Sequence, residues 1–299
     1  MAYVVISHRN PGQVLRLVGA LAEGSAARVL VSHDSRRSPL GASDIERAGG
    51  RATGDRIEME WGGFSHVELI VRCLREAAER YDPDWVVMLS GQDYPLRPLD
   101  DIEADLGRSR ADGLLGAVRE VERRRPRAGD DEFFLRCRYR HYTRAHGFPH
   151  LPRAARPVVY ARDLPRLVGV RRPLPAPLAF HASSDWFTLG RRAIGVALDA
   201  SADRRLMRHF RRVAVPSESF FASVLLNRPE LTIEFDHRRF ASFSGLGVPH
   251  PDTLTSADFE RIVSSGADFA RKFDVSVDGA VLDRLDERRR SAPEPGFGR

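Results

Sequence analysis

The sequence predicts an α/β domain in which helices cover a central sheet. Short β-rich runs at residues 3–7, 28–32 and 84–89 alternate with segments whose apolar residues recur at helical spacing. Such alternation is typical of a sheet flanked by helices. The 299 residues, of which 42% are hydrophobic, contain no internal repeat and no long linker. We therefore expect one large domain.

Composition excludes several other classes of protein. No stretch of about 18 apolar residues is free of charged residues, so we expect no membrane-spanning helix. The apolar run at residues 3–7 follows no basic residues, unlike the core of a secretory leader. The two cysteines, Cys73 and Cys137, lack the spacing of a metal site. These features favour a reducing, cytoplasmic location.

Local signals define the first elements. Residues 3–7 are mostly β-branched or aromatic, which favours a strand. Asn10 and Pro11 offer an N-cap and a first-turn proline, which predict a helix that stops near Gly24. Two further strands are expected at residues 28–32 and, more weakly, at residues 56–60.

The next helix and strand carry the clearest patterns. Ser65 and Glu68 form a capping box, which predicts the start of a helix that runs to about Tyr81. Residues 84–89 are apolar almost throughout, which favours a central strand covered on both faces. Later strands are expected at residues 113–118, 185–189 and 231–235, and later helices at 217–226, 257–263 and 277–289.

Positive charge is concentrated in one segment. The formal net charge is +6, whereas residues 119–172 contain 15 arginines and only six acidic residues. A basic segment on a nearly neutral body indicates an anionic partner such as a nucleotide phosphate, a lipid headgroup or a nucleic acid. A solvated, arginine-rich face is the alternative interpretation.

The carboxyl ends of the strands are the expected ligand site, as in open α/β sheets generally. This rule selects the loops that begin at His8, His33, Trp61 and Ser90. An acid pair after a strand could hold a divalent metal against a diphosphate, but Asp82 and Asp84 precede their strand. Only Asp93 follows it, and a lone carboxylate is a poor metal site. We therefore expect no metal, so fixed positive charge must stabilise any bound diphosphate.

Five segments in a fixed order carry a family resemblance. They are residues 61–65 (WGGFS), 89–95 (LSGQDYP), 183–187 (SSDWF), 216–221 (PSESFF) and 269–274 (FARKFD). Together they resemble the core-2/I-branching β-1,6-N-acetylglucosaminyltransferase family, in a bacterial-type form. That family also contains peptide O-xylosyltransferases. The resemblance runs from about residue 2 to residue 278 and is weakest over residues 119–172.

The resemblance implies a fold, a reaction and a division of the chain. The fold would be of GT-A type, with a mixed central sheet flanked by helices in a single domain over residues 1–285. A nucleotide-binding half would cover about residues 1–118, an acceptor and catalytic half residues 119–285, and a loose tail residues 286–299. The reaction would use a UDP-sugar, with GlcNAc favoured over xylose, invert the anomeric carbon and need no metal or other cofactor.

Two residues would carry the chemistry of this reaction. Glu218 matches the family's Pro-x-Glu motif, whose carboxylate is the general base, although first-turn glutamates are common in helices. Lys272 matches the lysine that faces the diphosphate, and it is the only lysine among 47 basic residues. The family's second basic residue has no clear match. The candidates for it are His250, Arg271, Arg238 and Arg239.

The remaining candidates divide between donor and acceptor. Those for the donor are His8, with Arg9 beside it, Asp34, Trp61, Ser90, Gln92, Asp93, Lys272, Arg271 and His250. Asp34 would contact the uridine and Trp61 would stack on the uracil. Alternatively, Asp34 would only form a turn at the end of its strand, and Trp61 would only fill a buried position in the core. Asp93 could instead brace the turn that follows it. The candidates for the acceptor or sugar are Asp185, Trp186 and Glu120, with Glu122 beside it, although the two glutamates are also typical surface charges.

Three functions are therefore weighed against one another. The leading hypothesis is a metal-independent, inverting glycosyltransferase with a glycan, lipid-linked or small-molecule acceptor. Its basic segment would contact an anionic membrane at the inner face. The second is a nucleic-acid-binding protein that uses residues 119–172, which lack a recognisable reading helix or aromatic RNA motif. The third is a binding protein without turnover, against which the presence of both Glu218 and Lys272 argues.

Overall fold

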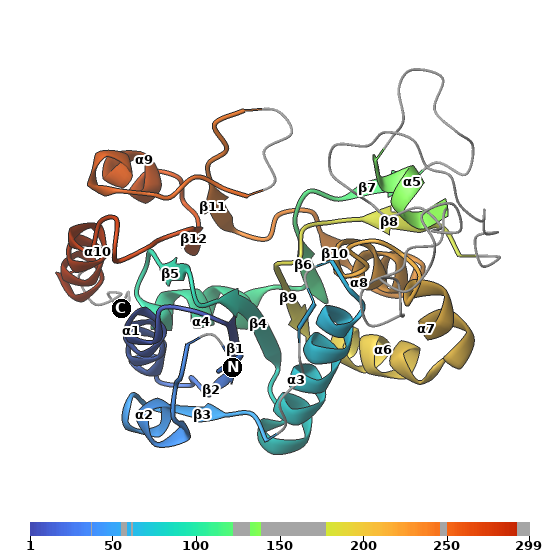
Figure 1. Cartoon of the computed structure of the whole chain (residues 1–299), viewed down its shortest axis with the longest axis horizontal. Coiled ribbons are helices and arrows are strands. Elements are labelled where there is room, and N and C mark those ends of the chain that lie inside the picture. Colours follow the sequence, from blue (N-terminus) through green and yellow to red (C-terminus); the bar gives the residue numbers. More distant parts are fainter. Residues whose placement is uncertain are drawn as a thin grey trace, which may run out of the picture.

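A seven-stranded mixed sheet, in the order β10–β6–β9–β4–β1–β2–β3, lies at the centre of the computed structural model (Figure 1). The structure describes residues 1–36, 38–54, 59–60, 62–121, 132–138, 178–245 and 250–291. The strands of this sheet are β1 (Ala2–Ser7), β2 (Val29–His33), β3 (Gly50–Ala52), β4 (Trp85–Ser90), β6 (Gly113–Leu115), β9 (Phe187–Gly190) and β10 (Ile233–Glu234).

The central strand is β4, whose six residues are all buried. It pairs in parallel with β1, which in turn pairs in parallel with β2. On its other side β4 pairs antiparallel with β9. The prediction of a central, doubly covered strand at residues 84–89 is confirmed, because an apolar run with no alternation can be buried only if both faces are covered.

Two smaller sheets extend the strand ends. One joins β11 (Arg239–Ala241), β12 (Phe269–Arg271) and β5 (Asp93–Pro95), and the other joins β7 (Arg119–Val121) and β8 (Phe180–Ala182). Because β5 begins three residues after β4 ends, the first of them is joined to the carboxyl end of the central strand. Figure 1 shows β5 and β12 beside this edge of the main sheet.

Helices cover both faces of the main sheet. They are α1 (Pro11–Ala22), α2 (Ala42–Arg47), α3 (Ser65–Tyr81), α4 (Leu99–Arg108), α5 (Glu132–Arg138), α6 (Arg191–Ala202), α7 (Arg204–Phe210), α8 (Ser217–Leu226), α9 (Phe259–Val263) and α10 (Ala280–Ser291), with a 3₁₀ turn at Ser256–Asp258. Val4 and Met88 pack with α3, α6 and α8, whereas Val5 and Leu89 pack with α1, α4 and α10. The expected mixed sheet flanked by helices is confirmed. Among the described residues, no helix is long and apolar enough to cross a membrane.

Several predicted elements differ in detail. The capping box at Ser65 is wrong, because Phe64 takes the N-cap position and the Ser65 hydroxyl accepts a hydrogen bond from Glu60 N instead. Asn10 does occupy the N-cap of α1, but its side chain donates to Asp274 Oδ1 at 3.1 Å and does not cap the helix. The expected capping hydrogen bond has been replaced by a distant residue for Asn10 and by the main chain five residues earlier for Ser65.

Other elements begin or end elsewhere. The third strand is Gly50–Ala52, whereas most of the predicted strand at residues 56–60 lies outside the described residues. Asp185 and Trp186 precede β9 and do not belong to it. Residues 286–291 are not loose, because α10 continues to Ser291; residues 292–299 are outside the described part. The sequence did not predict α2, α4, α5, α6 or α7.

Candidate functional site

The loops after β1, β2 and β4 meet at one edge of the sheet. Ser7 Oγ lies 2.8 Å from His33 Nδ1, and Asp34 N donates to Ser7 O at 2.9 Å. On the other side of β1, Gly91 N donates to Ile6 O at 3.0 Å. Parallel pairing therefore brings together three of the four loops selected by the strand-end rule. Trp61, in the fourth loop, lies outside the described residues.

Asp34 lies at this edge as half of an ion pair. Arg36 Nε and Nη2 donate to its two carboxylate oxygens at 2.8 and 2.5 Å, and these hydrogen bonds hold its pKa at about 2. The exposed side chain of His8 adds a smaller effect in the same direction. Arg36 also donates to Met59 O at 3.3 Å, which joins the loop after β2 to residue 59.

The turn after β4 is organised by Asp93. Ser90 N and Ser90 Oγ each donate to its carboxylate at 2.8 Å, and the Asp93 side chain is only 1% exposed. Gln92 N closes the turn by donating to Ser90 Oγ at 3.2 Å. Asp93 therefore braces the turn that precedes it, and not the turn after it that the alternative interpretation named. Gln92 is the more accessible side chain.

The segment 269–274 is clamped against this turn. Gln92 and Phe273 exchange two hydrogen bonds, from Phe273 N to Gln92 O at 2.9 Å and from Gln92 Nε2 to Phe273 O at 3.2 Å. The buried Gln13 side chain on α1 donates to Gly91 O and to Phe273 O, both at 3.0 Å. These contacts place Arg271 and Lys272 at the carboxyl end of the central strand.

Arg271 and Lys272 have different surroundings. The Arg271 guanidinium lies 4.3 Å from the centre of the Trp186 ring, and its Nε lies 3.3 Å from Asp93 Oδ1. Lys272 forms no hydrogen bond or ion pair through its side chain with any residue that the structure describes. Its pKa is lowered, first by burial and then by the positive charges of Arg9 and Arg271. Lys272 is thus the cation of this cluster that lacks a bound counter-charge among the described residues.

Arg238 and Arg239, two other candidates for the second basic residue, are bound to other parts of the protein, and the third, His250, is exposed. Arg239 is 7% exposed, and its Nη2 donates to Met88 O at 2.9 Å and Phe187 O at 3.2 Å. Burial lowers its pKa to about 10. Arg238 Nη2 lies 3.4 Å from Glu234 Oε2, so Arg238 forms an ion pair with that glutamate. His250 is exposed and follows residues 246–249, which are outside the described part. Arg239 therefore joins the ends of β4 and β9, and Arg271 is the basic residue beside Lys272.

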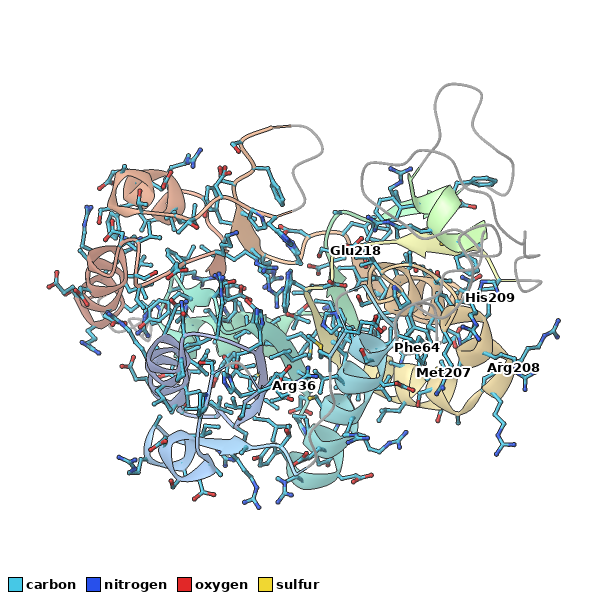
Figure 2. All side chains as sticks on the ribbon, viewed as in Figure 1. Arg36, Phe64, Met207, Arg208, His209 and Glu218 are labelled. Carbon is cyan, nitrogen blue, oxygen red and sulfur yellow. The ribbon has the colours of Figure 1, made fainter. Side chains whose placement is uncertain are left out.

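Glu218 lies in the first turn of α8 (Figure 2). Its main-chain oxygen accepts a hydrogen bond from Ser183 N at 2.8 Å, so α8 is joined to the loop that carries Asp185 and Trp186. Its side chain is 30% exposed and forms an ion pair with Arg136 of α5. The base candidate and the sugar-site candidates therefore lie on contacting segments.

Asp185 is the most unusual acid of this group. Its Oδ2 lies 4.0 Å from His66 Nδ1 of α3, whereas its Oδ1 is buried without a hydrogen-bond partner among the described residues. A buried carboxylate oxygen of this kind is suited to a ligand hydroxyl. By contrast, Glu120 is exposed on β7 and stands opposite His181 in the register with β8. Glu122 lies outside the described residues.

The glycine-rich loop also contacts this part of the molecule. Val215 N donates to Gly62 O at 2.9 Å, and Val215 has a left-handed φ of 45° immediately before Pro216. The turn that starts α8 therefore rests on the loop at residues 62–63. Four of the five motif segments thus touch another directly, and the segment 61–65 reaches the segment 216–221 through Val215.

No metal-binding group emerges from the described part of the chain, where no three His, Cys, Asp or Glu residues cluster suitably. Asp82 and Asp84 lie at the opposite end of β4 and form ion pairs with Arg191. The sequence analysis missed Gln13, Arg36, His66 and Arg136. A glutamine on the apolar face of a predicted helix was a usable signal for Gln13. Nothing in the aperiodic basic segment distinguished Arg136 from its neighbours.

Comparison with known proteins matches this chain to one family model. Residues 31–262 match the model described as Core-2/I-branching enzyme. Xylosyltransferase 1 of Homo sapiens is 26% identical over 260 residues, which cover 79% of this chain and 24% of that protein. Xylosyltransferase 2 of Pan troglodytes is 26% identical over 325 residues, which cover 99% of this chain and 34% of that protein.

The chain spans about a quarter to a third of the length of these curated relatives. Among solved structures, mouse xyloside xylosyltransferase 1 in its apo form is similar with a TM-score of 0.42 at 10% identity. That match covers 90% of this chain and 97% of the mouse chain.

Proposed function

The chain belongs to the Core-2/I-branching enzyme family, and on this premise we propose that it is an inverting glycosyltransferase. It would move a sugar from a UDP-sugar to an acceptor hydroxyl without a metal ion. The acceptor O–H bond breaks, the acceptor oxygen bonds to the anomeric carbon, and UDP leaves with the electrons of the old bond. The proton goes to an enzyme carboxylate.

One observation supports this proposal above the others: the five motif segments are linked in one series of contacts, four of them directly and the segment 61–65 through Val215. Gly62 meets Val215 before α8, and Glu218 on α8 meets Ser183. Trp186 then meets Arg271, which meets Asp93 after β4. Segments that lie far apart in the sequence thus surround one edge of the sheet. This is the arrangement that a two-substrate transfer requires, because the base, the sugar and the leaving group must be close together.

Glu218 is the general base in this proposal. Its position in the first turn of α8 favours a negative charge through the helix dipole. Its side chain is partly exposed, so an acceptor hydroxyl can reach the carboxylate. The base takes the acceptor proton as the new bond forms, which makes the oxygen a stronger nucleophile.

Lys272 stabilises the UDP leaving group. Charge develops on the β-phosphate as the bond to the sugar breaks, and a positioned ammonium stabilises that charge. Arg9 and Arg271 supply further positive potential, which is visible in their effect on the pKa of Lys272. These three cations, at the end of a buried strand, support a metal-independent reaction.

The other candidates hold the donor and the acceptor. Asp34, His8 and Trp61 would bind the nucleoside, while Ser90, Gln92 and Asp93 shape the floor of the site. Asp185 and Trp186 would bind the sugar. We propose GlcNAc as the transferred sugar. Xylose is the second candidate, because the relatives named above are xylosyltransferases.

The acceptor and the location remain part of the proposal. A glycan, a lipid-linked sugar or a small molecule would receive the sugar in the cytoplasm. The basic segment would contact an anionic membrane surface. Most of residues 119–172 lie outside the described part of the chain. A nucleic-acid partner is the competing hypothesis.

A panel of UDP-sugars tests the proposal. Purified chain is incubated with UDP-GlcNAc, UDP-xylose, UDP-glucose and UDP-galactose, and release of UDP is followed by mass spectrometry. Release from one donor well above the others is expected. Scanning fluorimetry provides the binding arm: UDP should raise the melting temperature, whereas a random oligonucleotide should not. Stabilisation by the oligonucleotide alone, with no UDP released from any donor, would contradict the proposal.

A further inference from the structure

The basic segment supplies a residue that touches the proposed base. Arg136 Nη1 forms an ion pair with Glu218 Oε2. The Arg136 side chain is only 12% exposed. A largely buried guanidinium is a more directional partner than a surface cation, since it is less hydrated and presents its donors in a fixed plane.

Arg136 is held on a fixed support. It lies on α5, whose Phe134 and Cys137 are 2% and 1% exposed and belong to the same core cluster as α8. Residues three apart share one face of a helix, so these two side chains anchor α5. The Arg136 guanidinium also lies 4.9 Å from the centre of the Phe133 ring, which Arg119 approaches at 5.0 Å.

We propose that Arg136 is a positioning residue for Glu218. Its guanidinium holds the carboxylate through Oε2, in the orientation in which the carboxylate takes the proton from the acceptor. This inference rests on the proposed function and gives α5 a role in orienting the base. The physical gain is pre-organisation. A free glutamate must lose rotational freedom before it can act, whereas one already held loses less during the reaction.

The proposal separates the chemical step from donor binding. Arg136 contacts α8, while the UDP-binding candidates His8, Asp34 and Gln92 follow β1, β2 and β4. Loss of the guanidinium should therefore lower kcat and leave the KM for the UDP-sugar nearly unchanged. Misplacing a reacting group by about 1 Å can lower the rate by about 10²-fold.

The experiment measures UDP release from the donor that the unaltered chain turns over fastest, with water as acceptor. Arg136→Met keeps the length of the side chain but removes its charge and donors, so kcat should fall by about 10- to 100-fold at unchanged KM. Arg136→Lys should recover part of the loss. Arg119→Met is the matched control, because Arg119 shares the Phe133 ring but forms no ion pair with Glu218. It should keep kcat within about twofold of the unaltered chain.

A double variant distinguishes positioning from simple damage to α5. If Arg136 acts through Glu218, then Arg136→Met added to Glu218→Gln should lower kcat no further than Glu218→Gln alone. Additive losses, or full kcat in folded Arg136→Met, would overturn the inference while the unaltered chain still turned over its donor. Absence of turnover by the unaltered chain on every donor would overturn the proposed function, and this inference with it.

Discussion

Asp93 and Arg271 stand opposite each other where β5 pairs with β12, with Arg271 Nε 3.3 Å from Asp93 Oδ1. The same guanidinium covers the Trp186 ring. Arg271 is therefore held on two sides by the protein itself. Its neighbour Lys272 has no such partner among the described residues, which is why the proposed function assigns the charge of the leaving group to the Lys272 ammonium.

Replacing Lys272 should affect turnover more than binding. Lys272→Ala should lower kcat by about 10²-fold or more, with a smaller loss of UDP affinity, because the contact strengthens as the β-phosphate gains charge. Lys272→Arg should recover only part, since a planar fork cannot occupy the same point. Steady-state kinetics and UDP titration measure both effects, with Arg110→Ala as a surface control. Full activity in folded Lys272→Ala would remove this role.

The proposed base can be tested by an isosteric change. Glu218→Gln retains the shape of the side chain but cannot accept the proton, so kcat should fall by about 10²–10⁴-fold while UDP affinity is nearly unchanged. Glu79→Gln, an exposed change on α3, is the matched control and should retain normal kinetics. More than a tenth of the normal rate in Glu218→Gln would exclude Glu218 as the base.

Chelation tests the nature of the diphosphate site. If Arg9, Arg271 and Lys272 provide the positive charge, then UDP release should persist in excess EDTA. The rate is measured before and after dialysis against EDTA and again after addition of manganese. Activity that disappears in EDTA and returns with manganese would show that a metal ion performs the task assigned to Lys272.

His237 should make stability depend on pH. Burial, and then the charge of Arg239, lower its pKa to about 4, whereas an unfolded histidine titrates near about 6.5. Between these values the unfolded chain binds the extra proton, so stability falls as pH decreases from about 6.5 to 4. The free energy of unfolding, measured in urea at pH 7 and pH 5, should differ less between the two pH values for His237→Gln than for the unaltered chain. An equal difference would contradict this assignment.

Gly91 should resist substitution because of packing. A Cβ at this position would lie 2.7 Å from Ser7 Cβ and 2.9 Å from Val14 Cγ2, so β1 and α1 would both have to move away from residue 91. Gly91→Ala should destabilise the fold by about 1–3 kcal/mol. Gly19→Ala, on α1, meets nothing within 4 Å and should instead stabilise by roughly 0.5–1 kcal/mol. Urea denaturation of both variants checks the contrast, and equal stabilities would refute it.

The sequence predicted the elements whose signals are local. The apolar run at residues 84–89 favoured a central strand covered on both faces, and the structure has β4 at the centre of the sheet. The signals at Ser65 and Asn10 were local too, yet Ser65 accepts from Glu60 and Asn10 donates to Asp274. A polar side chain that can satisfy a local or a distant group takes whichever the packed chain brings nearer, and the pattern alone does not record this.

By itself the sequence determined which loops share an edge and which motifs they carry, because parallel strands direct their carboxyl ends the same way. Only the tertiary structure decided the partners: Arg271 with Asp93, Arg239 with the carbonyls of β4 and β9, and Arg136 with Glu218. Only Arg271 lies in a motif segment, and nothing in the sequence names the partner of any of the three arginines. What separates them is burial and the direction of each guanidinium, and both are set by strand pairing and helix packing between segments far apart in the chain.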